Sequence, residues 1–164
     1  MAVRPILIFP DSRLRQMALQ VMRFDADLAA LAEDLLDSLR AAPGIGITAP
    51  HLGILQRLVV LELDGPGSAR TYVNPEIIWA SAETRRHAEG SVSMPGVTDE
   101  VERPAQIRIR YQDLTGKHHE EAAEGLLAVC HQHEIDQLDG IFWIYRLSRL
   151  KRERLVKRYD KQRP

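Results

Sequence analysis

The pattern with the clearest chemical potential is HQHEIDQLDG, residues 131–140, which places His133 directly before Glu134. In helices that carry H-E-x-x-H, two histidines one turn apart bind one metal ion, and the Glu acts as general base on the metal-bound water. Here the residue four positions after His133 is Gln137. The stretch is therefore a working metal site, an altered one, or an ordinary helix that carries a His-Glu pair.

Three helices are predicted, one of which must carry this pair. Residues 125–138 have a strongly apolar helical pattern that includes His133 and Glu134. An earlier helix is predicted over about 25–40, with Asp25 as its cap and a leucine face. That face consists of Leu28, Leu31, Leu35 and Leu39. A basic C-terminal helix is predicted over about 148–162, with Ser148 as its cap.

Strands are predicted between the helices, because β-branched and alternating apolar residues recur there. The expected strands are 57–63, 71–80, 106–112 and about 117–123. The dipeptide Asn74-Pro75 should interrupt the second of them. Helix, strands, central helix and terminal helix together predict an α+β fold. The length of 164 residues favours a single domain, residues 1–164.

Charge is unevenly distributed along the chain. Residues 145–164 contain nine Lys or Arg and two acidic residues, whereas the chain as a whole has a formal net charge of −1. Cys130 is the only cysteine, which excludes an intramolecular disulfide and suits a reducing compartment. The first 30 residues contain no unbroken apolar run with a small-residue cleavage site, so we expect no signal peptide, and no apolar run approaches the length of a membrane span. We therefore expect a cytoplasmic protein with no membrane and no DNA partner.

Three separated stretches resemble the signature motifs of peptide deformylases. GIGITAPHLG (44–53), AEGSVSMPG (88–96) and CHQHEIDQLDG (130–140) are similar to G-x-G-x-A-A-x-Q, E-G-C-L-S and H-E-x-D-H, in the same order. The start ILIFPDSRLR and residues 101–113 and 141–155 also resemble this family. The resemblance implies antiparallel strands around a central motif-bearing helix, and removal of the formyl group from the initiator methionine of nascent chains.

Carried over residue by residue, the family's site is only partly present. The resemblance implies that a Cys and two His hold the metal, usually iron, with nickel, cobalt or zinc as substitutes. These ligand positions are Ser91, His133 and Gln137. The acid/base Glu is Glu134, and the oxyanion-stabilising Gln position is His51. The remaining implied site residues are Val92, through its backbone N–H, and the substrate-cleft residues Ile45, Gly46, Val92 and Ser93.

The two changed ligand positions predict that the family's metal site is lost. A thiolate and an imidazole are strong donors to transition metals, whereas the Ser91 alcohol and the Gln137 amide are weak ones. We therefore expect no bound metal or other cofactor. Without a metal, Glu134 has no activated water beside it. In this interpretation Ser91, His133, Glu134 and Gln137 form a buried hydrogen-bonded network, and His131 is a surface residue.

Two alternatives keep hydrolytic chemistry. In the first, His51, His133 and Glu134 form a rebuilt three-ligand site that is acceptable to zinc. In the second, Ser91 is a nucleophile with His133 or His51 as its base. The spacing of these residues does not specifically support a serine nucleophile, and neither does a nucleophile-elbow motif of the kind found in serine hydrolases.

The sequence thus predicts a deformylase-like protein without the family's metal-dependent chemistry, which binds peptide N-termini or a partner. The alternative is an active hydrolase, a deformylase or another amidase, with a rebuilt site. The basic helix over 148–162 adds a further prediction, a salt-sensitive contact between its Lys and Arg side chains and the phosphates of ribosomal RNA.

Overall fold

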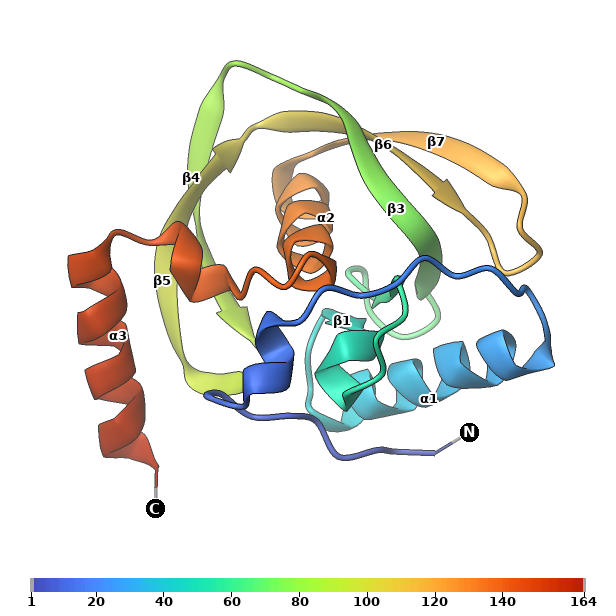
Figure 1. Ribbon diagram of the computed structural model, residues 1–164. Coiled ribbons are helices and arrows are strands. Elements are labelled where there is room, and N and C mark those ends of the chain that lie inside the picture. Colours follow the sequence, from blue (N-terminus) through green and yellow to red (C-terminus); the bar gives the residue numbers. More distant parts are fainter. Residues whose placement is uncertain (1, 164) are drawn as a thin grey trace.

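Two antiparallel sheets and three α-helices make up residues 2–163, the part of the chain that the computed structural model describes (Figure 1). The larger sheet has the order β1-β2-β3-β6-β7, with every neighbouring pair antiparallel. Its strands are β1 (Gly46–Thr48), β2 (Leu58–Leu61), β3 (Arg70–Ala80), β6 (Gln106–Gln112) and β7 (His118–Glu124). The smaller sheet pairs β4 (Thr84–Ser91) with β5 (Met94–Pro104). The predicted α+β fold is confirmed.

Helix α2 (Gly125–Leu138) lies at the centre, surrounded by strands of both sheets (Figure 1). Every residue from Cys130 to Leu138 is buried. Ile135 and Leu138 belong to the core that α2 forms with the larger sheet. Because residues 130–138 are buried, their polar side chains must find partners within the protein. The fold therefore holds His133 and Glu134 in positions that neighbouring side chains determine.

Helix α1 (Ala26–Ala41) covers β1 and β2 and fixes the segment that contains His51. Asp25 caps it by accepting a hydrogen bond from the backbone N–H of Leu28 at 3.1 Å. The predicted leucine face is buried and packs against Ile47, Leu58 and Val60. A 3-10 turn, Ala49–Leu52, follows β1 directly and carries His51. Two further 3-10 turns span Ser12–Arg15 and Trp143–Arg146.

The sequence predicts an interruption at Asn74-Pro75, but strand β3 continues through this dipeptide and is only irregular there. Asn74 has φ +50°, a left-handed conformation that Asn tolerates better than most residues, and the pairing of β3 with β6 shifts register there. The Asn74 side chain accepts from the backbone N–H of Val21 at 2.8 Å and donates to its carbonyl oxygen at 3.0 Å. Asn74 thus anchors the N-terminal segment to the larger sheet.

Helix α3 (Arg149–Gln162) packs against β5, at the side of the molecule away from β7 (Figure 1). It begins after Ser148, whose hydroxyl accepts from the backbone N–H of Lys151 at 3.3 Å. Its buried residues, Leu155 and Tyr159, join a core cluster with Val97 and Val101 of β5. This confirms the predicted terminal helix. Within residues 2–163 no helix is both long and apolar enough to cross a membrane.

Candidate functional site

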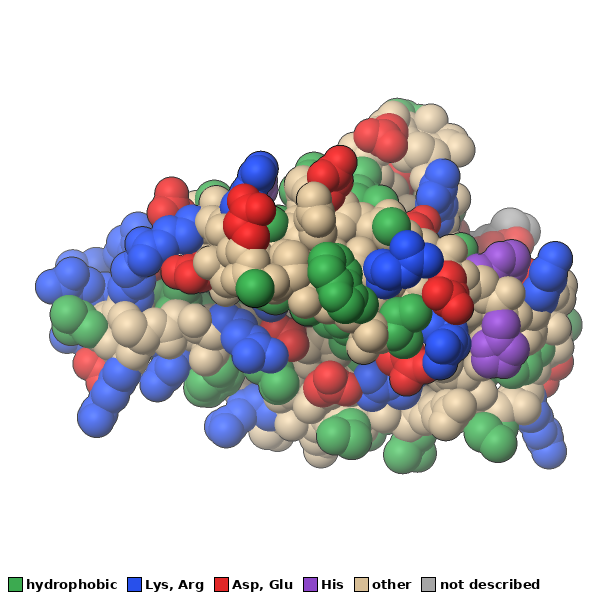
Figure 2. All heavy atoms as spheres, turned by 90° about the horizontal axis from the view of Figure 1, so that it is seen from above, with side chains coloured by type: hydrophobic (Ala, Val, Ile, Leu, Met, Phe, Trp, Pro, Cys, Tyr) green, Lys and Arg blue, Asp and Glu red, His purple; other side chains and the backbone are tan. Residues whose placement is uncertain are grey.

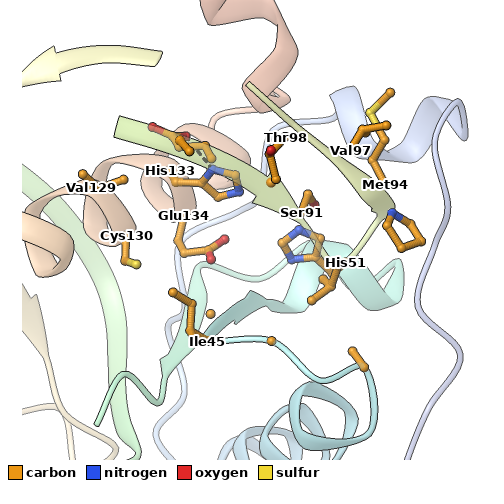
Figure 3. Close-up of a pocket in the computed structure, with 18 of the residues that line it drawn as sticks. Ile45, His51, Ser91, Met94, Val97, Thr98, Val129, Cys130, His133 and Glu134 are labelled. Atoms are coloured by element: carbon orange, nitrogen blue, oxygen red, sulfur yellow. Dashed lines mark hydrogen bonds and ion pairs between the residues drawn. The ribbon is translucent and has the colours of Figure 1, made fainter. Parts of the chain in front are cut away.

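A cavity of about 450 Å³ opens beside α2 and is lined by parts of all three motif-like stretches (Figure 3). Its lining includes Ile45, Gly46, His51, Ser91, Val92, Cys130, His133 and Glu134. Two residues that the sequence analysis placed in the site do not line it. Ser93 is buried outside the lining, and so is Gln137.

The carboxyl group of Glu134, a buried residue of α2, lines this cavity. Its side chain is buried, and Oε1 has no hydrogen-bond partner among the described residues. Burial raises the pKa of Glu134 to about 7, because the nearby charge of His133 only partly offsets the loss of water. A Cβ atom at Gly46 would collide with Glu134 Oε2, so only glycine lets the backbone pass this close.

We expect Glu134→Gln to remove a pH-dependent loss of stability. The pKa is about 7 in the folded chain against an ordinary value of 4.5, so the folded state holds the proton more tightly between these values. The free energy of unfolding therefore falls as the pH rises from 4.5 to about 7. The Gln variant cannot ionise and should lack this fall.

Urea unfolding of both chains at low and high pH measures this effect. The difference in free energy of unfolding between the two chains should change by about 1–3 kcal/mol from low to high pH. A stability difference that does not vary with pH would contradict the raised pKa.

A buried network of charged groups orients His133. Its Nδ1–H donates to Glu89 Oε1 at 2.8 Å, and Arg103 donates twice to the same carboxylate, at 2.5 and 2.9 Å. Arg103 also donates to Asp136 at 2.8 Å, and Arg146 closes the network on Asp136. Burial alone would raise the pKa of Glu89, but the hydrogen bonds from Arg103 and His133 lower it to about 2. The network thus keeps Glu89 ionised and the His133 ring fixed.

His51 is held as a neutral hydrogen-bond donor. Its Nδ1 accepts from the backbone N–H of Thr48 at 2.9 Å, so in the neutral ring the proton resides on Nε2. Burial, reinforced by the charge of His133, lowers the pKa of His51 to about 3. Nε2 is buried and has no partner among the described residues. In Figure 3 the His51 ring lies beside Ser91 in the cavity wall. His51 therefore offers an unused N–H where the resemblance implies a Gln amide.

The structure does not form the predicted network among Ser91, His133, Glu134 and Gln137. The Ser91 hydroxyl oxygen accepts from the backbone N–H of Ser93 at 3.0 Å. The Gln137 amide donates to the carbonyl oxygen of Leu14 at 2.7 Å. Buried polar groups pair with the nearest partner available, and for Gln137 that partner is a backbone carbonyl of the N-terminal 3-10 turn. The cavity thus brings together His51, Ser91, His133 and Glu134, but not Gln137.

The donors that remain do not suit the family's metal. A ligating imidazole nitrogen must be unprotonated, whereas the Thr48 contact puts the proton of His51 on Nε2. Cys130 lines the cavity, but burial raises the pKa of its thiol to about 12, so it does not provide a ready thiolate. Over residues 2–163 no group of three or more His, Cys, Asp and Glu side chains is arranged to hold a metal ion.

Two features of this region escape the sequence analysis. His131, expected at the surface, is buried and its Nε2 lies 2.6 Å from Glu121 Oε2, against the edge of Tyr72. That expectation is wrong because residues 130–138 of α2 are all buried, so this part of the helix has no solvent face. Arg103 was also missed, since nothing in its local sequence distinguishes a buried Arg from an exposed one.

Comparisons with known proteins extend over nearly the whole chain. The family model for polypeptide deformylase matches residues 3–153. A peptide deformylase-like protein of Brucella melitensis is 66% identical over 161 residues, 98% of each chain. A peptide deformylase of Phenylobacterium zucineum is 46% identical over 164 residues, 98% of this chain and 97% of that one. The crystal structure of a peptide deformylase from Legionella pneumophila matches with a TM-score of 0.93 and 38% identity, covering 99% of this chain and 100% of that one.

Proposed function

Because the chain belongs to the polypeptide deformylase family, we propose that it binds formyl-blocked peptide N-termini without the family's metal-dependent hydrolysis. The observation that carries this proposal is the position of Gln137. Its amide is occupied by the Leu14 carbonyl at 2.7 Å, and its side chain does not line the cavity. With Ser91 at a second ligand position, His133 is the one family ligand that remains.

The cavity offers groups that match a formamide. His51 Nε2–H is a buried donor without a partner, suited to the formyl oxygen. In this proposal the backbone N–H of Val92 is the second donor to that oxygen. Glu134 Oε1 is a buried acceptor for the amide N–H. The apolar side chains of Ile45, Val97 and Leu126, which line the same cavity, suit a methionine side chain.

The alternative function, an active hydrolase, has two forms. A rebuilt metal site requires His51 to give up either its Nε2 proton or its contact with Thr48. A serine mechanism requires a base that accepts a hydrogen bond from the Ser91 hydroxyl. Within residues 2–163 neither His51 nor His133 is hydrogen-bonded to Ser91. Both observations favour a binding function over the alternative.

Titration calorimetry of a formyl-Met tripeptide and its free-amine counterpart tests this proposal. We expect the formyl peptide to bind more tightly, and His51→Leu to weaken its binding about tenfold, or ~1.4 kcal/mol. The matched variant His51→Gln keeps a donor at the same position and should retain the affinity. Equal binding of the two peptides, or equal affinities for the Leu and Gln variants, would contradict the proposed role of His51.

A further inference from the structure

A second cavity, of about 580 Å³, lies between β5 and α3 and is almost entirely cationic on its helix side. Its lining consists of Thr98, Asp99, Lys151, Arg154, Lys157, Arg158 and Lys161. The five cationic residues recur at three- and four-residue spacing, so they form one stripe along α3. We call this region the α3 groove.

The cations of the α3 groove are exposed and available to a ligand. All five side chains are exposed, and within residues 2–163 none of them forms an ion pair with a carboxylate. Arg158 donates a long hydrogen bond to the carbonyl oxygen of Thr98, at 3.4 Å. Figure 2 shows Lys and Arg side chains gathered at the end of the molecule that α3 occupies. Such a stripe attracts a flexible anionic segment.

The α3 groove shares a wall with the cavity beside α2 that contains His51 and Glu134, which we call the peptide cavity. Thr98 of β5 lines both cavities, and Figure 3 shows it at the edge of the peptide cavity. Gly96, also in the lining of the peptide cavity, lies so close to α3 that an added Cβ would be 2.6 Å from Gln162 Oε1. A peptide whose first residue occupies the cavity therefore meets the α3 groove where its chain passes over β5.

We propose that the α3 groove selects ligands with acidic residues downstream of the bound N-terminus. This inference rests on the proposed function, because the cavity must first hold the peptide's end. An acidic peptide fits the groove better than RNA does. The lining offers no aromatic side chain on which a base could stack, and Thr98 places the groove beside the cavity that holds the peptide's end in the proposed function. Lys and Arg side chains along one helix face complement a few carboxylates spaced along an extended chain.

Fluorescence anisotropy with formyl-Met octapeptides tests the inference. The peptides carry a pair of Glu, Lys or Ser residues, placed early, midway or late in the sequence. We expect the Glu pair at its best position to bind about fivefold more tightly than the Ser pair at low ionic strength, and the Lys pair to bind more weakly than both. The preference should diminish at higher salt, because both partners are exposed.

Charge reversal identifies the surface responsible. Arg154→Glu with Arg158→Glu should abolish the preference for Glu peptides and leave the Ser peptide unaffected. The matched control, Arg85→Glu with Arg86→Glu, makes the same charge change on β4, where both side chains are exposed. It should retain the preference.

Three outcomes overturn the inference. If the peptides bind regardless of their charge, the α3 groove does not select them and the proposed function stands. If no formyl peptide binds, the proposed function fails together with the inference. If a single-stranded RNA oligonucleotide binds through Arg154 and Arg158 while no charged peptide is preferred, the groove is a nucleic-acid surface.

Discussion

Ser91→Cys and Gln137→His together are expected to give the chain a metal affinity at least about 100-fold higher than that of the unsubstituted chain. Loss of an outer-shell partner alone typically costs 10–100-fold in metal affinity, and two direct ligands are restored here. The rest of the site is in place, because the Glu89 contact holds the His133 ring through Nδ1–H and so leaves Nε2 as the nitrogen that can bind a metal. The imidazole introduced at position 137 would lie one helical turn after His133 on α2, where the two rings can share an ion.

Competition with a chromophoric zinc chelator measures this change, and each single substitution should give only part of it. Ser68→Cys with Gln20→His introduces the same two residue types outside the cavity and should leave metal affinity at its starting level. If the unsubstituted chain already binds as tightly as the double variant, Ser91 and Gln137 are not the reason for a weak site.

Arg103→Met is expected to reduce the free energy of unfolding by about 3–5 kcal/mol. Arg103 is 6% exposed and holds the carboxylates of Glu89 and Asp136 at 2.5 to 2.9 Å. Removing one partner from a buried charged network leaves the other charges unpaired in a medium that solvates them poorly. His133 should also lose its fixed orientation, because it depends on the same Glu89 carboxylate.

Urea unfolding at neutral pH measures this loss. Arg85→Met is the matched control, because Arg85 is highly exposed and its contact with Glu83 is long, at 3.6 Å. It should change stability by no more than about 0.5 kcal/mol. A loss below about 1 kcal/mol for Arg103→Met would show that the network does not support the fold.

Much of the fold can be predicted from the sequence, because several elements carry strong local signals. The leucine spacing and Asp25 cap of α1 and the apolar run of α2 appear where expected. At Asn74, where a break is expected, β3 instead continues with a shift of its register against β6. The β4–β5 hairpin does not, and the reason is physical. Seven of the eight residues of β4 are not buried, Glu89 being the exception, so the strand shows no apolar alternation. It forms through backbone pairing with β5.

The sequence predicts which residues meet at the candidate site, but it does not predict the hydrogen bonds that they form there. His51, Ser91, His133 and Glu134 converge on the cavity, as the resemblance to the family implies. The contact of Gln137 with Leu14 joins residues far apart in the sequence, so no local pattern signals it. The tautomer of His51 depends on one backbone N–H, at Thr48, whose direction is set only when β1 and the following turn have formed.

We propose that this member of the deformylase family keeps a peptide-binding cavity but lacks the family's metal chemistry. The most direct test is the metal content of the purified chain after incubation with iron, nickel or zinc, combined with hydrolysis of a formyl-Met peptide. We predict well below one ion per chain, and no turnover that distinguishes the chain from Glu134→Gln. One tightly held ion per chain, with turnover abolished by Glu134→Gln, would contradict the claim.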